Sequence, residues 1–349
     1  MVKKSYFYLG EQNIGIEAPK VLLKRIGRNF EEVPIENGFN VGDVKVEEGE
    51  MVEFSRDRSK PYLATKLNDS RGYHGVDFLR YGVLVRTIWQ RNPPHYEVQN
   101  FLPLDETGAL SCFKKIYYNT SSSKNKALIH GSLVCVGGKG ILITGKCWSG
   151  KTSLTLGFLE KFLGDFVSDG NVLISYEDGH IVGHYLPRPV FVRFHSINSS
   201  KGLSGLLKKP YEAESIQPFD KEAIEEIIAG KKYELDAGLN ISRRKFAELI
   251  GVKTTPTLKV DRVVHTKFGC TDLPTINPIS VEASYGLLLA REFPKETTLG
   301  NLRHQKEIER PDDSIIERDW LDGVERVETS FDANKTLTKS LLEDLICSH

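Results

Sequence analysis

One stretch of the sequence has the residue types and the spacing of a phosphate-binding loop. Residues 145–152 read Gly-Lys-Cys-Trp-Ser-Gly-Lys-Thr and match the pattern G-x-x-x-x-G-K-[S/T]. Glycines let the backbone turn tightly, so that its N–H groups converge on phosphate oxygens together with the positive end of the following helix. Lys151 is expected to reach the β- and γ-phosphates, and the Thr152 hydroxyl to complete a Mg²⁺ shell. The pattern predicts that ATP, or a close relative, and Mg²⁺ bind through Gly145, Lys146, Cys147, Trp148, Ser149, Gly150, Lys151 and Thr152.

The residues on either side of the loop favour this interpretation over a glycine-rich turn with an exposed lysine. The apolar segment 141–144 precedes the loop and is typical of a strand. After the loop, Leu154, Phe158 and Phe162 follow one another at helical spacing. A strand, a glycine-rich loop and a helix in succession form the context that the motif requires, so a chance match is disfavoured.

A triphosphate site also needs an acid that holds the metal, and Asp169 is the candidate. It follows the apolar pair Phe166 and Val167, just after the helix, where a chain returning to the sheet would bring it close to the loop. Asp169 and Gly170 are equally compatible with a plain turn. His130, within the apolar segment 127–134, is a candidate for handling a proton, although lone histidines in apolar strands are more often structural.

Two arginines and one tryptophan are further candidates. Arg188 and Arg193 could clamp a transferring phosphoryl group, or they could be surface charges beside a proline-rich turn. Trp148 could shield the nucleotide, but an aromatic residue in a loop packs more commonly on its own domain.

The positioning elements suggest a mixed α/β protein with three parts. Residues 1–122 alternate short apolar stretches with turn residues and predict a β-rich module, and the polar segment 119–126 is the expected linker. Residues 123–300 form the expected phosphate-loop domain, with a helical insertion at about 196–255, strand-like alternation at 257–268 and a serine-capped helix at 280–293. Residues 301–349 predict an acidic extension of helix and loop.

Composition limits the partners. The 47 basic and 47 acidic residues of this 349-residue chain cancel, so nothing indicates bulk affinity for nucleic acid or an anionic membrane. The five cysteines are widely spaced and form no C-x-x-C pair, which favours a reducing compartment. We find no signal peptide and no long apolar run, and we therefore expect a cytoplasmic protein that does not span a membrane.

The pieces in their order resemble the catalytic domain of the HPr kinase/phosphorylase family. In that family an H-G-x-L-V segment precedes a glycine turn, an apolar strand, the phosphate loop, a helix and an acidic pair. The matching residues here are 130–134, 138–140, 141–144, 145–152 and 168–169, within about fifty residues of chain. The resemblance implies a phosphate loop on a mixed, partly antiparallel sheet, related to phosphoenolpyruvate carboxykinase. It also implies Mg²⁺-dependent phosphorylation of a hydroxyl, on a protein serine or another acceptor, functional roles for His130 and Asp169, and assembly into homo-oligomers.

One departure from the family affects the chemistry. Relatives usually carry two consecutive acids after the helix, the second suited to accept the hydroxyl proton, whereas Gly170 follows Asp169 here. Either Asp169 does both jobs, or His130 supplies the base, or phosphotransfer is altered or lost. The alternatives to a kinase are therefore a regulatory nucleotide-binding protein and an NTP hydrolase. A guanine-nucleotide switch is disfavoured, because neither N-K-x-D nor D-x-x-G follows Thr152.

Overall fold

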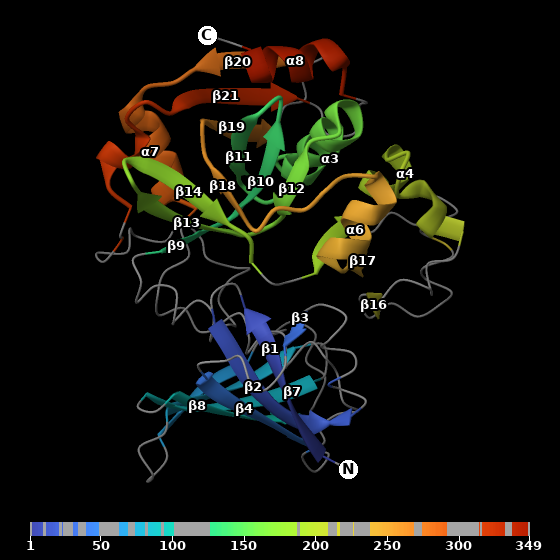
Figure 1. The fold of residues 1–349 in the computed structure, drawn as a ribbon, viewed down its shortest axis with the longest axis vertical. Helices are drawn as coiled ribbons and strands as arrows, with labels where there is room; N and C mark the ends of the chain where they lie inside the picture. Colours follow the sequence, from blue (N-terminus) through green and yellow to red (C-terminus); the bar gives the residue numbers. More distant parts are fainter. Residues whose placement is uncertain are drawn as a thin grey trace. The chain divides into compact units, whose positions relative to one another are not determined.

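The computed structural model divides into two compact units, each described here by itself (Figure 1). The first unit comprises Met1–Ser121 and Lys295–Glu307, and the second comprises Ser122–Pro294 and Ile308–His349. In the first unit the structure describes eight strands and residues 20 and 23. In the second it describes residues 126–186, 189–208, 238–268, 274–291, 316–331 and 337–347, together with 215–216, 226 and 314.

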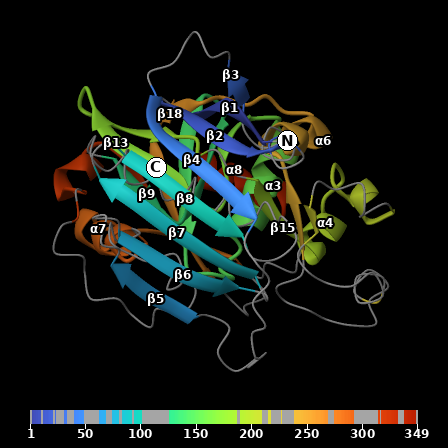
Figure 2. The same cartoon turned by 90° about the horizontal axis from the view of Figure 1, so that it is seen from below.

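The first unit contains an eight-stranded sheet in the order β3-β1-β2-β4-β8-β7-β6-β5. Strand β4 pairs in parallel with β2 and with β8, and the other neighbours are antiparallel. Figure 2 shows β4, β8, β7, β6 and β5 running side by side in the blue and cyan part of the chain. The strands are β1 (Val2–Leu9), β2 (Gln12–Pro19), β3 (Glu31–Val33), β4 (Asn40–Glu48), β5 (Leu63–Asn68), β6 (His74–Arg80), β7 (Val83–Arg91) and β8 (Pro94–Asn100).

The second unit is built on a six-stranded mixed sheet in the order β12-β10-β11-β19-β21-β20. Strands β11, β19 and β21 are parallel, and the pairs β10–β11, β10–β12 and β20–β21 are antiparallel. Parallel and antiparallel pairing in one sheet with helices confirms the predicted mixed α/β class. The strands are β10 (Gly131–Val136), β11 (Lys139–Gly145), β12 (Asp165–Ser168), β19 (Arg262–Phe268), β20 (Thr275–Pro278) and β21 (Glu325–Phe331).

Two smaller sheets complete the strands of this unit. One has the order β18-β14-β13-β9, with β9 (Ala127–Ile129), β13 (Val172–Glu177), β14 (His180–His184) and β18 (Thr257–Lys259). The other has the order β15-β17-β16, with β15 (Val190–Arg193), β16 (Ser215–Ile216) and β17 (Gly238–Ile241). All pairs in both are antiparallel.

Helix α3 (Lys151–Phe162) follows the phosphate-loop sequence and packs on the main sheet. Its residues Leu154, Phe158 and Leu159 are fully buried in a cluster with apolar side chains of β10 and β11, which explains their helical spacing. Helix α8 (Lys339–Cys347) covers the same cluster, and a Cβ on Gly157 would lie 2.9 Å from the Leu337 side chain. The remaining helices are α4 (Phe194–Ser199), α6 (Arg243–Ile250), α7 (Val281–Leu289) and the short 3₁₀ segments η2 (Ser204–Lys208) and η5 (Arg318–Leu321).

The structure confirms the predicted helix after the loop, which is α3, and the predicted serine-capped helix, and it corrects two other predictions. The serine-capped helix is α7, where the Ser280 side chain accepts a hydrogen bond from the amide of Ala283. The prediction of a separate helix-and-loop extension at 301–349 is wrong for β21, which lies inside the sheet between β19 and β20. The predicted insertion at 196–255 is not wholly helical, because β17 lies between α4 and α6 and pairs with β15. Many other residues of that insertion lie outside the described parts.

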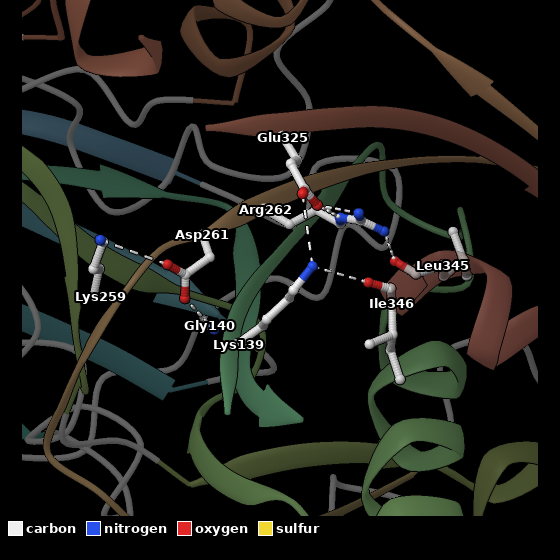
Figure 3. A network of polar contacts seen from close by, with 8 residues as sticks. All are labelled: Lys139, Gly140, Lys259, Asp261, Arg262, Glu325, Leu345 and Ile346. Carbon is white, nitrogen blue, oxygen red and sulfur yellow. Dashed lines mark hydrogen bonds and ion pairs between the residues drawn. The ribbon is translucent and has the colours of Figure 1, made fainter. Parts of the chain in front are cut away.

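Buried charge ties the C-terminal helix to the start of the parallel strands (Figure 3). The fully buried side chain of Arg262 donates from Nε to Glu325 Oε2 at 2.6 Å, and its Nη1 donates to the Leu345 carbonyl. Lys139 Nζ donates to the Ile346 carbonyl at 3.4 Å. Cations at the last carbonyls of a helix satisfy acceptors that have no partner within the helix. This network therefore holds α8 at one end of β11, and the loop lies at the other end.

Candidate functional site

The phosphate-loop sequence forms a tight connection between β11 and α3. Gly150 has φ 87° and precedes the first residue of the helix, in a left-handed conformation that favours glycine. A Cβ on Gly145 would lie 2.4 Å from Thr266 Oγ1 and 2.5 Å from Ser149 Oγ, so no side chain fits there. Both glycines are thus required by the backbone path, as the motif predicts.

A chain of hydroxyls braces the loop against the neighbouring parallel strand. Thr266 lies opposite Gly145 on β19, and its hydroxyl donates to the Thr144 carbonyl at 3.1 Å. Ser149 Oγ lies 2.6 Å from Thr266 Oγ1 and is the donor in that contact when the Thr266 proton is used for Thr144. Thr266 was not a candidate from the sequence, because only the pairing of β11 with β19 brings it to the loop.

Lys151 is buried beneath the loop and carries an unfavourable charge. Its side chain is 8% exposed, and Nζ donates to the carbonyls of Lys146 at 2.8 Å and Gly145 at 3.0 Å. The pKa of Lys151 is lowered to about 8, chiefly by burial and to a smaller extent by the positive charges of Arg291 and Arg193, while Cys147 and Asp169 oppose the shift. An anion bound at the loop would compensate this concentration of positive charge.

A buried carboxylate lies next to the first turn of α3. Asp169 directly follows β12, is 4% exposed, and accepts a hydrogen bond from the Thr152 hydroxyl, with 3.1 Å to Oδ2 and 3.4 Å to Oδ1. The hydroxyl of Ser132, on β10, donates to Oδ1 of the same carboxylate. Three segments that are distant in the sequence thus meet at Asp169. Sequence reasoning anticipated Asp169 beside Thr152 but missed Ser132.

The pair Thr152 and Asp169 suits a Mg²⁺ ion that arrives with a nucleotide. Within the described residues no group of three or more His, Cys, Asp or Glu side chains could hold a metal by itself. Mg²⁺ in phosphate sites usually keeps several waters and takes only one or two carboxylates besides the substrate phosphates. One hydroxyl and one buried carboxylate in hydrogen-bond contact match that donor set.

Two arginines add positive charge near the loop. Arg193, at the end of β15, has Cζ 3.7 Å from the ring centroid of Trp148, whose backbone φ is 70°. Arg291 follows α7, and burial lowers its pKa, while Cys147 of the loop opposes that shift. Sequence reasoning named Arg193 and Trp148 separately and missed Arg291. Arg188 lies outside the described residues.

His130 lies at the junction of two sheets, in the bend between β9 and β10. It is half-buried, its amide donates to the Arg291 carbonyl at 2.9 Å, and its own carbonyl accepts from the Thr144 hydroxyl at 3.2 Å. These backbone contacts place His130 beside the last residues of β11 and next to the segment that carries Arg291. A proton-handling role for its side chain stays a prediction.

Comparisons with known proteins give a limited result. No protein-family model matches the sequence, and no curated protein is significantly similar to it. One solved structure found by fold comparison is the Hpr(Ser) kinase/phosphatase from Coxiella burnetii, at 11% sequence identity and a TM-score of 0.30, over 64% of this chain and 95% of that chain. A likeness this distant has no bearing on the activity of this chain. In the part of the chain that the structure describes, no helix has the length and apolar character needed to cross a membrane.

Proposed function

We propose that this chain is an ATP- and Mg²⁺-dependent kinase that transfers the γ-phosphoryl group to a hydroxyl. The acceptor is a protein or peptide serine or a small metabolite. The contact that carries the proposal joins Thr152, at the first turn of α3, to the buried carboxylate of Asp169 at 3.1 Å, directly beside the loop that buries Lys151. The ordered segments 130–134, 138–152 and 168–169 support divergent membership of the HPr kinase/phosphorylase family.

The roles of the residues follow from their charges and positions. The loop amides and Lys151 bind the phosphates, while Arg193 and Arg291 add charge against the negative oxygens of the transferring group. Thr152 and Asp169 would hold Mg²⁺, which would supply positive charge to neutralise the phosphates. Phosphoryl transfer needs little covalent chemistry from the protein, so positioning by these groups supplies most of the catalysis.

The acceptor hydroxyl must lose a proton, and two groups could take it. Asp169 is a carboxylate within the cluster, but it already accepts hydrogen bonds from Ser132 and Thr152. His130 is half-buried beside the end of β11, and histidine is the side chain most often used as a general base. Variants of the two residues distinguish them: the base is the residue whose replacement removes the acidic limb of the pH–rate profile.

A nucleotide-binding regulatory protein without phosphotransfer is the second candidate. Gly170 stands where relatives have a second acid, and both oxygens of Asp169 are engaged by hydroxyls. This arrangement favours a carboxylate used for metal binding, with no second acid directly after it to receive a proton. Hydrolysis of the nucleotide by water needs the same proton transfer and is the third outcome to measure.

Calorimetry and a transfer assay test the proposal together. Titrating the full chain with ATP and with GTP, each with Mg²⁺, measures binding and nucleotide preference. Incubation with γ-labelled ATP and a panel of protein extracts and metabolites measures transfer. Lys151→Ala should abolish both, whereas Lys161→Ala, an exposed lysine in the last turn of α3, should change neither. Binding without label transfer or phosphate release supports the regulatory alternative, and transfer that survives Lys151→Ala refutes the assignment to this loop.

A further inference from the structure

The main sheet contains one irregularity, and it lies beside Asp169. Along the antiparallel pair β10–β12, Cys135 pairs with Asp165 and Val134 with Phe166, but Leu133 pairs with Ser168. Val167 is therefore the extra residue of a β-bulge. A regular ladder would have put Ser168 level with Ser132, whereas the bulge moves the chain on by one residue and puts Asp169 there. Bulges commonly re-aim a side chain next to a functional site.

Ser132 is the polar member of an otherwise apolar face. Side chains alternate between the two faces of a strand, so Ser132 shares a face with Val134 and Val136. Those two valines are packed in the core cluster that contains the buried side of α3. Ser132 is fully buried, and burying a hydroxyl is costly unless it has a partner. Its partner is Oδ1 of Asp169.

The two hydroxyls around Asp169 define how its carboxylate is oriented. Ser132 approaches Oδ1 from β10, and Thr152 approaches from α3, closer to Oδ2 at 3.1 Å than to Oδ1 at 3.4 Å. With Oδ1 held by the sheet, Oδ2 faces the helix turn that carries the other expected metal ligand. The orientation is thus set by a residue of the sheet that lies outside the phosphate loop.

We propose that Ser132 is a positioning residue, which with the β12 bulge fixes the Asp169 carboxylate so that Oδ2 serves the Mg²⁺ of a bound nucleotide. This inference rests on the proposed nucleotide site and adds a residue outside the phosphate-loop motif to it. Ser132 acts through Asp169 and touches neither nucleotide nor acceptor. Removing its hydroxyl should weaken the contribution of Mg²⁺ to nucleotide affinity and leave phosphate binding by the loop unchanged.

The test separates the metal from the nucleotide. For the full chain, calorimetry measures the affinity for ATP with saturating Mg²⁺ and in EDTA, and the ratio of the two affinities is the Mg²⁺ coupling. Ser132→Ala should reduce this coupling about tenfold, as is typical when a residue that orients a metal ligand is removed, with the affinity in EDTA unchanged. Ser175→Ala, which removes another buried serine hydroxyl from β13, should leave the coupling as it is in the unmodified chain.

Two further variants decide whether Ser132 works through Asp169. In an Asp169→Asn background, which itself lowers the coupling, adding Ser132→Ala should cause no further loss. Ser132→Thr keeps the hydroxyl and should retain the coupling to within about threefold, and this variant decides the matter if Ser132→Ala does not fold. Coupling unchanged in Ser132→Ala, or lost in Ser132→Thr, overturns the inference while the nucleotide site stands. Failure of the unmodified chain to bind ATP overturns both.

Discussion

Replacing Lys151 with methionine should stabilise the nucleotide-free protein while abolishing phosphate binding. The lysine is 8% exposed, and its pKa falls from 10.5 to about 8, chiefly through burial. At about 1.4 kcal/mol per pKa unit, holding this charge in its site at pH 7 costs about 3 kcal/mol. Methionine removes the charge and keeps most of the side-chain volume.

The gain is smaller than that cost, because the substitution also removes two hydrogen bonds. Lys151 Nζ donates to the carbonyls of Gly145 and Lys146, and each bond contributes about 1 kcal/mol net. The free energy of unfolding should therefore rise by about 1 kcal/mol at pH 7 in Lys151→Met. Lys161→Met, at an exposed position of α3, should stay within about 0.5 kcal/mol of the unmodified chain.

The pH dependence of the stability difference distinguishes an effect of the Lys151 charge from an effect of packing. Between pH 8 and 10.5 the unfolded chain keeps the Lys151 proton that the folded chain has lost, so the contribution of Lys151 to the stability of the unmodified protein rises with pH over this interval. Lys151→Met lacks this rise, and its advantage should vanish and then reverse as pH increases. Other titrating groups are common to both proteins and cancel in the difference.

The stability of the unit that holds the loop is measured by urea unfolding at pH 7 and pH 10. Hydrogen exchange of peptides from β11 and α3 reports the unfolding of this unit. If Lys151→Met is less stable than the unmodified chain at pH 7 by 1 kcal/mol or more, the reasoning is refuted. Such a result would mean that the buried charge is well compensated without a nucleotide. A stability difference that does not change between the two pH values would refute it as well.

Other substitutions test the packing of the loop and its sheet. Gly145→Ala should lower ATP affinity at least tenfold by calorimetry, because its Cβ would clash with Thr266 and Ser149. Arg262→Ala should lower the free energy of urea unfolding by about 2 kcal/mol, because it leaves the buried Leu345 carbonyl without its donor, while Glu325 keeps its contact with Lys139. Arg193→Ala should reduce the rate of label transfer at least tenfold while changing ATP affinity less than threefold, if its charge acts on the transferring group.

The features that could be predicted from the sequence are those formed by residues close together in the chain. The loop, the apolar strand before it, the spacing of Leu154, Phe158 and Phe162, and the cap of α7 are each properties of a short window. Asp169 could be placed near the loop because only one helix separates the two. These features depend on backbone preferences and hydrophobic periodicity, which act within a few turns of chain.

The site residues that could not be predicted depend on pairing between segments that are distant in the sequence. Thr266, Ser132 and Arg291 join the site through the contacts β11–β19, β10–β12 and the amide of His130 with the Arg291 carbonyl. None of these pairings can be predicted from a short stretch of the sequence. Strand β21 was missed for another reason: its alternation of exposed and buried residues lies in an acidic segment, and the charge suggested a surface.

Hydrogen exchange on nucleotide binding tests the central claim most directly. If the amides of residues 146–152 converge on a polyphosphate, MgATP should slow exchange in peptides that cover this loop and the first turn of α3. The same nucleotide should leave exchange unchanged in Lys151→Ala. Protection confined to other segments, or equal protection in the substituted chain, would contradict a phosphate site between Gly145 and Thr152.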